Sequence, residues 1–230
     1  MQPAESTPPW VALVPLKPLG AAKSRLDHPA RRSLALAMAL DTAAAVLDAG
    51  SDAVGALIVV TDDRAARDAL TGLARARGLA ERLLVTADEP RGGLNPAFAH
   101  AAALARVLYP GWGTAALSAD LPALRPQQVR RALAAAPVAG HGVLADAAGT
   151  GTVLLSAAAG TDLHPRFGPG SFAAHRDSGA VDLTLLLTDQ VPGLRRDVDT
   201  VADLAVARAL GLGPATSSVL AAAPSPRSAA

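Results

Sequence analysis

Short, continuously apolar segments alternate with longer segments of helical periodicity along most of the chain. Apolar runs that end in turn residues are typical of buried strands, whereas apolar residues spaced three and four apart are typical of helices. The apolar runs predict strands at Val11–Leu16, Val54–Thr61, Leu83–Thr86, Thr114–Ser118, Gly142–Ala145, Thr152–Ser156, Val181–Leu187 and Leu194–Arg196. The helical segments between them are Ala30–Ala49, Ala65–Arg77, Pro96–Leu108, Gln127–Ala136, Ser171–Ser178 and Val201–Leu210.

Fully apolar strands that are each followed by a helix indicate a mostly parallel sheet, because the crossover helices cover both of its faces. The sequence therefore predicts an α/β protein with a Rossmann-like, doubly wound sheet in three layers, α/β/α. The alternation weakens after residue 137, where two strands follow each other across Asp146–Gly151. We expect an antiparallel element there.

Both ends of the chain lack a periodic pattern and are rich in Pro, Ser and Ala. Such composition is typical of disordered segments. We expect disordered tails at residues 1–9 and 212–230, and a single domain at residues 10–211.

Composition removes several classes of protein. The 230 residues include no cysteine, which excludes disulfides, iron–sulfur clusters, zinc ribbons and cysteine nucleophiles. A net charge of +1 gives no general attraction to nucleic acid or to an anionic membrane. The first residues lack the basic flank and apolar run of a signal peptide, which favours a cytoplasmic protein. The oligomeric state stays open.

The first candidate site is the loop after the first predicted strand. It carries Lys17, Lys23 and Arg25 but one glycine, Gly20. Three cations between a strand end and a helix can hold a triphosphate, and the alternative is a solvated basic loop. Neither the Walker loop nor the G-x-G-x-x-G dinucleotide pattern is present, so phosphate binding here would depend on side-chain charge.

Two further strand ends carry polar residues. In TDD, Asp62 or Asp63 is interpreted as a cap of the next helix. In RGGLNPAFAHA, two glycines permit close backbone approach, and Asn95 offers an amide that can pair with a base edge or a ribose hydroxyl. The alternative for Asn95 is a cap of the helix that begins at Pro96.

Three aspartates are candidate metal ligands. Asp120 lies two residues after an apolar strand that ends at Ser118, and Asp197 and Asp199 have the i, i+2 spacing that places both side chains on one side of an extended segment. Like charges this close repel unless a cation lies between them, and carboxylate oxygens suit Mg²⁺. The alternatives are a turn residue at Asp120 and a helix cap at Asp199 or Thr200.

The segment RFGPGSF predicts a phosphate site. Gly168 and Gly170 precede a helix that begins at Ser171, and such a turn offers free backbone amides, a hydroxyl and a positive helix end. The histidines have no H-x-x-x-H spacing and the serines no G-x-S-x-G elbow. Zinc-hydrolase and α/β-hydrolase chemistry therefore have no support.

Together these segments resemble one family. VPLKPL…AKSRL, GGLNPA, ADLPAL, GTGTVLL, RFGPGS and DVDT…DL occur in this order from residue 10 to about residue 210. They are similar to the MobA-like guanylyltransferases of deazaflavin coenzyme F-420 biosynthesis, which act on 2-phospho-L-lactate or phosphoenolpyruvate. The resemblance implies a nucleotidyltransferase fold of the nucleotide-diphospho-sugar transferase type.

The resemblance also implies a role for individual residues. Lys17 and Lys23, with Arg25 beside them, would contact the phosphates of GTP, and Asn95 would lie near the guanosine. Mg²⁺ would be held by Asp120, Asp197 and Asp199, and the phosphate of the three-carbon acid by Thr152, Gly168 and Ser171. Lys17, Lys23 and Asp120 would form the catalytic set.

The expected reaction joins two polyanions. A phosphate oxygen of the acceptor attacks the α-phosphorus of GTP and pyrophosphate leaves, with catalysis by positioning and by positive charge. The alanine- and arginine-rich composition indicates a GC-rich actinobacterial genome, where the family that the chain resembles more often uses phosphoenolpyruvate. The resemblance therefore implies phosphoenolpyruvate as the acceptor, and 2-phospho-L-lactate and 3-phosphoglycerate stay open. The rival interpretations are another MobA-like nucleotidyl- or sugar-nucleotide transferase, and a non-catalytic nucleotide-binding module.

Overall fold

The fold follows from how the predicted apolar runs pair. The computed structural model describes residues 9–20, 23, 25–89 and 92–222. Its strands are β1 (Trp10–Pro15), β2 (Val54–Val60), β3 (Leu83–Thr86), β4 (Gly113–Leu117), β5 (His141–Ala145), β6 (Thr152–Ala157) and β7 (Val181–Asp182). Its helices are α1 (Arg31–Leu47), α2 (Arg64–Ala76), α3 (Leu94–Leu108), α4 (Pro126–Ala135), α5 (Ser171–Asp177), α6 (Thr184–Leu187), α7 (Val201–Ala209) and α8 (Pro214–Ala222), with a 3₁₀ turn at Ala80–Arg82.

All of these strands form one sheet in the order β3-β2-β1-β4-β6-β5-β7. β6 runs antiparallel to both of its neighbours, and the other pairs are parallel. The predicted antiparallel element is thus the β5–β6 hairpin. Because β6 runs in the reverse direction, its first residue, Thr152, lies at the end of the sheet that holds the carboxyl ends of the parallel strands.

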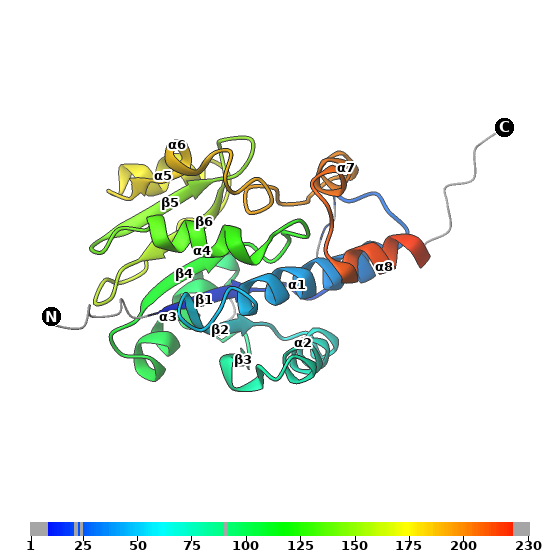
Figure 1. Ribbon diagram of the computed structural model, residues 1–230, viewed down its shortest axis with the longest axis horizontal. Helices are drawn as coiled ribbons and strands as arrows, with labels where there is room; N and C mark the ends of the chain where they lie inside the picture. The colour runs from blue at the N-terminus through cyan, green and yellow to red at the C-terminus, as the bar shows by residue number, and fades with distance from the viewer. Residues whose placement is uncertain (1–8, 21–22, 24, 90–91, 223–230) are drawn as a thin grey trace, which may run out of the picture.

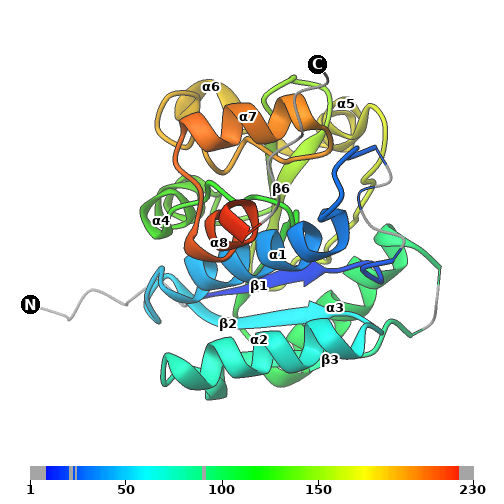
Figure 2. The same ribbon diagram turned by 90° about the vertical axis from the view of Figure 1, so that its right-hand side faces the viewer.

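Helices cover both faces of the sheet (Figures 1 and 2). Successive residues of β1 point to opposite faces: Ala12 and Val14 pack with α1, α2 and α4, whereas Val11 and Leu13 pack with α3. This alternation explains why the strands are apolar throughout. The predicted three-layer α/β/α fold is confirmed.

The C-terminal segment differs from the prediction. The sequence predicts a disordered tail from residue 212, yet Pro214–Ala222 form α8, which packs along α1 (Figure 1). Asp41 of α1 accepts hydrogen bonds from the backbone N–H groups of Ala215 (3.0 Å) and Thr216 (2.8 Å), and so caps α8. Within the described ranges, no helix has both the length and the apolar character that a membrane crossing requires.

One predicted strand is wrong in part, and another is wrong entirely. Val181–Leu187 is a strand only over β7, after which the chain turns into α6, because the Asp182 carboxylate accepts the N–H of Thr184 at 2.8 Å. Leu194–Arg196 forms no strand and instead lies in a turn. The buried side chain of Leu194 explains the apolar signal there. The predicted tails at residues 1–8 and 223–230 lie outside the described residues.

The chain reverses its direction of winding between the adjacent strands β1 and β4. From β1 the chain adds β2 and then β3 on one side, and later adds β4 on the other side. The loops that follow β1 and β4 therefore diverge and leave a crevice at the carboxyl ends of the strands. Open α/β sheets bind their ligands at such a crevice.

Candidate functional site

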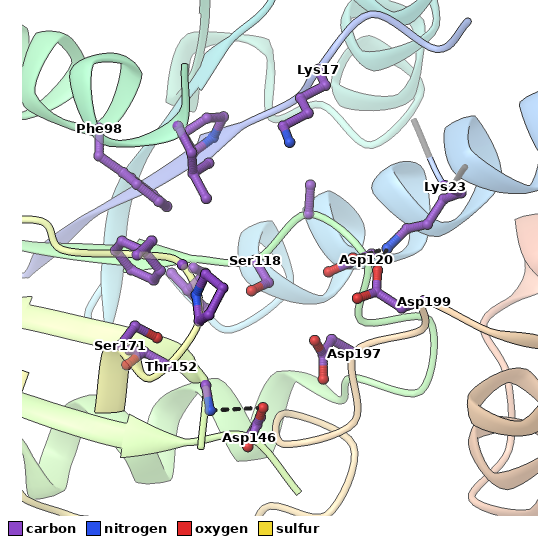
Figure 3. Close-up of a pocket in the computed structure, with 18 of the residues that line it drawn as sticks. Lys17, Lys23, Phe98, Ser118, Asp120, Asp146, Thr152, Ser171, Asp197 and Asp199 are labelled. Atoms are coloured by element: carbon purple, nitrogen blue, oxygen red, sulfur yellow. Dashed lines mark hydrogen bonds and ion pairs between the residues drawn. The ribbon is translucent and has the colours of Figure 1, made fainter. Parts of the chain in front are cut away.

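A pocket of about 650 Å³ opens at this crevice (Figure 3). The loops after β1, β4 and β5 contribute residues to it. The turn before α5 and the segment before α7 contribute the others. Nearly every candidate from the sequence lines it: Lys17, Lys23, Arg25, Asp120, Thr152, Gly168, Ser171, Asp197 and Asp199. The single candidate that does not line it is Asn95.

One end of the pocket is acidic and contains a buried lysine. The ammonium group of Lys23 forms ion pairs with Asp120 and, at 3.0 Å, with Asp199, and its side chain is only 9% exposed. Arg25 pairs with the other oxygen of Asp199 from the exposed side. Burial by itself would lower the pKa of Lys23, but the two carboxylates outweigh it and raise that pKa. Lys23 is therefore charged and occupies the space between Asp120 and Asp199.

Asp197 lies beside this pair and faces negative charge (Figure 3). Burial, followed by the charges of Asp120, Asp146 and Asp199, raises the pKa of Asp197 to about 7. Among the described residues, no Lys or Arg forms an ion pair with Asp197. A carboxylate in such surroundings is stabilised by any cation that enters the pocket.

The sequence analysis missed Asp146. Its carboxylate accepts the N–H groups of Thr150 (3.0 Å) and Gly151 (2.9 Å), which closes the turn between β5 and β6, and it lines the same pocket. The signal was available, because Asp146 follows β5 directly, as Asp120 follows the end of β4. Across the described part of the chain, however, no group of three Asp, Glu, His or Cys side chains is already arranged around a metal position.

The opposite end of the pocket has a different chemistry. The turn before α5 lines this end with Gly168, Gly170 and the buried Ser171, and Ser171 lies beside Thr152 at the start of β6 (Figure 3). Gly168 and Gly170 adopt φ values of 142° and 71°, which favour glycine. The N–H groups of Ser171 and Phe172 already donate to the carbonyls of Gly168 (3.1 Å) and Thr150 (3.2 Å), so the free backbone amides that the sequence predicts are not available at these two positions. The turn still offers small residues and two hydroxyl groups, which can bind an anion such as a phosphate.

Asn95 supports this turn from behind. Its side-chain oxygen accepts the N–H of Phe167 at 2.7 Å, and its side-chain nitrogen donates to the carbonyl of Phe167 at 3.0 Å. The helix cap is Gly93, so Asn95 is not the cap that the sequence left as an alternative. Phe167 also stacks on Phe98, with ring centroids 4.3 Å apart. The amide thus holds the backbone next to Gly168.

Two capping residues fix the loops that carry the charges. Asp63 caps α2, as the sequence analysis allowed, and also accepts the N–H of Leu19 at 3.0 Å, which ties the basic loop to α2. Thr200 caps α7 in a reciprocal pair with Asp203. Asp199 therefore does not cap α7, and its side chain points into the pocket (Figure 3).

Similar proteins carry a common name. Phosphoenolpyruvate guanylyltransferase of Frankia casuarinae is 55% identical over 223 residues, which cover 92% of this chain and 76% of that protein. The protein of the same name from Streptomyces scabiei is 50% identical over 216 residues, which cover 92% of this chain and 96% of that protein. The chain belongs to the phosphoenolpyruvate guanylyltransferase family. No general protein-family model matches it.

The solved structures agree on the fold. A nucleotidyl transferase from Methanothermobacter superposes with a TM-score of 0.54 at 18% identity, over 87% of this chain and 97% of that chain. At this identity the likeness concerns the fold alone. The guanylyltransferase family and the nucleotidyltransferase fold that the sequence motifs implied are both confirmed.

Proposed function

We propose that this protein transfers GMP from GTP to phosphoenolpyruvate and releases pyrophosphate. The relatives that are 50–55% identical carry the name of this activity. The observation that carries the proposal is a single pocket with a lysine–carboxylate end and a glycine turn with two hydroxyls, at the sheet edge where such folds bind ligands.

The reaction needs two anions to approach each other. An oxygen of the acceptor phosphate attacks the α-phosphorus of GTP, the bond to the bridging oxygen of the β-phosphate breaks, and pyrophosphate leaves with that electron pair. A phosphate monoester is already anionic at neutral pH, so the step requires no general base. The protein contributes positioning and positive charge.

We assign the GTP phosphates to the lysine–carboxylate end of the pocket. Lys17 is exposed beside the end of β1, and Lys23 and Arg25 follow on the same loop. Lys23 is charged and buried, so its field at the pocket is weakly screened by solvent. Lys17 and Lys23 would stabilise the charge that develops on the leaving pyrophosphate.

Mg²⁺ fits the acidic end by its donor chemistry. Asp120, Asp197 and Asp199 offer hard oxygen ligands, and the raised pKa of Asp197 marks a carboxylate that lacks a compensating cation. When bound, Mg²⁺ would supply positive charge to the reacting phosphates. The three carboxylates would hold it, and Lys23 would then be available to the same phosphates.

The acceptor phosphate belongs at the glycine turn. Thr152 and Ser171 offer hydroxyl groups, and Gly168 allows the backbone to approach closely because no Cβ intervenes. Asn95 would take part by holding Phe167, next to this turn, and not by contacting the guanosine.

The test is an incubation with GTP, Mg²⁺ and one acceptor at a time: phosphoenolpyruvate, 2-phospho-L-lactate or 3-phosphoglycerate. We expect pyrophosphate release and a guanylylated product, identified by mass, with phosphoenolpyruvate as the preferred acceptor. Release of a nucleoside diphosphate would instead indicate a sugar-nucleotide transferase. GTP binding without turnover on any phosphorylated acid would contradict the proposal.

A further inference from the structure

Behind the glycine turn lies a histidine that the proposed reaction does not use. His175 of α5 is fully buried, one helical turn after Ser171 and on the same face of the helix. Its ring nitrogen Nδ1 lies 2.9 Å from the hydroxyl oxygen of Thr152, and Nε2 accepts the backbone N–H of Arg166 at 2.9 Å. Its ring forms a T-shaped pair with the ring of Phe167, with centroids 5.2 Å apart.

These two contacts fix where the ring proton lies. A backbone N–H can only donate, so Nε2 must carry a free lone pair toward Arg166. In the neutral ring the proton then lies on Nδ1, which donates to the Thr152 oxygen. The opposite arrangement would place an Nε2–H against the Arg166 N–H, two donors 2.9 Å apart. A doubly protonated ring would create the same conflict.

The direction of the Thr152 hydroxyl follows. An oxygen that accepts the Nδ1–H bond keeps its own proton for another acceptor. Thr152 is 7% exposed and lines the pocket, so the pocket is the open side for that proton. We infer that His175 is a positioning residue that holds the Thr152 hydroxyl as a hydrogen-bond donor to the acceptor phosphate. This inference rests on the proposed function of the site.

The ring state can be tested without any activity. ¹⁵N chemical shifts of the His175 ring distinguish a protonated Nδ1 from a protonated Nε2, and the spectrum of His175→Gln identifies the signal among the five histidines. We expect a neutral ring with the proton on Nδ1 at pH 7. A proton on Nε2, or on both nitrogens, would overturn the inference.

Two substitutions of His175 separate its two contacts. In His175→Asn the side-chain NH₂ lies as many bonds from Cα as Nδ1, so it can donate to Thr152 while Arg166 loses its acceptor. In His175→Gln the side-chain oxygen reaches the position of Nε2, so Arg166 keeps its acceptor while Thr152 loses its donor. A positioning role predicts that His175→Gln raises the KM for phosphoenolpyruvate about tenfold, and more than His175→Asn does.

The KM for GTP serves as the internal control and should change less than twofold in both variants. Thr152→Val should raise the KM for phosphoenolpyruvate at least as much as His175→Gln, and the double variant should be no worse than Thr152→Val, because both remove the same donor. If Thr152→Val impairs phosphoenolpyruvate and His175→Gln does not, the inference fails and the proposed function stands. If Thr152→Val has no effect, the acceptor site itself is wrongly placed.

Discussion

The hydroxyl oxygen of Thr42, in the middle of α1, accepts the backbone N–H of Leu121 at 3.0 Å. The same hydroxyl lies 3.2 Å from the carbonyl of Ala119 and 2.8 Å from that of Met38. Thr42 is fully buried. The hydroxyl has one proton, which the nearer carbonyl of Met38 accepts, so the bond from the Leu121 N–H is the clamp that ties the Asp120 loop to α1. The direction of the Asp120 carboxylate therefore depends on α1.

We predict that Thr42→Val lowers both stability and turnover. The substitution keeps the shape of the side chain but leaves the Leu121 N–H buried without a partner, which costs about 1–3 kcal/mol. We expect a lower midpoint in chemical denaturation and a kcat reduced about tenfold, because Asp120 loses its support. Thr42→Ser keeps the hydroxyl and is the matched control. Equal activity of the Val and Ser variants would show that the clamp does not position Asp120.

We predict that Asp199→Asn reduces kcat by roughly two orders of magnitude, because it removes the negative charge that pairs with Lys23 and Arg25 and that would hold Mg²⁺. The amide is isosteric, so the thermal unfolding midpoint should change little. Asp189→Asn removes an exposed charge that does not line the pocket and is the control. Near-normal turnover of Asp199→Asn at saturating Mg²⁺ would exclude a metal role for this residue.

We predict that Ser171→Ala weakens the acid substrate. Ser171 is 2% exposed and lines the glycine turn, and a hydrogen bond to a charged phosphate contributes about 1.5–3 kcal/mol. Steady-state kinetics should show a KM for phosphoenolpyruvate raised about tenfold or more, with the KM for GTP nearly unchanged. An effect confined to GTP would move Ser171 to the nucleotide side of the pocket.

We predict that Asn95→Ala acts on the acceptor more than on GTP. The substitution breaks two hydrogen bonds to the backbone of Phe167 and loosens the turn that contains Gly168. The KM for phosphoenolpyruvate should rise about tenfold, while the KM for GTP should rise less. A larger effect on GTP would support the direct contact with guanosine that the resemblance implied.

We predict that His175 makes stability depend on pH. Burial, followed by the positive charge of Arg166, lowers the pKa of His175 to about 4, against about 6.5 in the unfolded chain. Between these values the unfolded chain binds the extra proton, so the free energy of unfolding falls as the pH falls from about 6.5 to about 4. At about 1.4 kcal/mol per pKa unit, the full loss is about 3 kcal/mol.

His175→Gln isolates this contribution from that of the carboxylates that titrate in the same range. Denaturation curves at pH 7 and pH 4.5 should show a smaller loss of stability for the variant than for the unmodified protein. Parallel losses in the two proteins would mean that His175 titrates normally in the folded state.

The sheet and most of the site could be predicted because they depend on local signals. Continuous apolar runs indicate strands buried on both faces, and polar residues in the loop after a strand, such as Asp120, indicate the ligand-binding end of the sheet. Asp146 carries the same signal. What made it harder to recognise is its place in a hairpin turn, where an aspartate commonly bonds to its own backbone, as this one also does.

The failures have two causes: an apolar run that is not buried, and partners that are distant along the chain. Leu185 and Leu186 lengthen the apolar run after β7, yet they are 89% and 62% exposed, so their hydrophobicity reports no burial in the sheet. Asn95 offers an amide whose target, Phe167, lies 72 residues away. His175 has no recognisable spacing to Thr152, because only the reversed direction of β6 brings that residue beneath α5.

The docking of α8 sets a practical limit on trimming this protein. Asp41 is 6% exposed and bonds to the first turn of α8, and Leu34 and Met38 share an apolar cluster with residues of α7 and α8. Truncation at residue 211, where composition suggests that the fold ends, would remove the N–H partners of Asp41 and expose apolar side chains of α1. The same helix also holds the Asp120 loop. A shortened version intended for crystallisation or enzymology should retain every residue through Ala222.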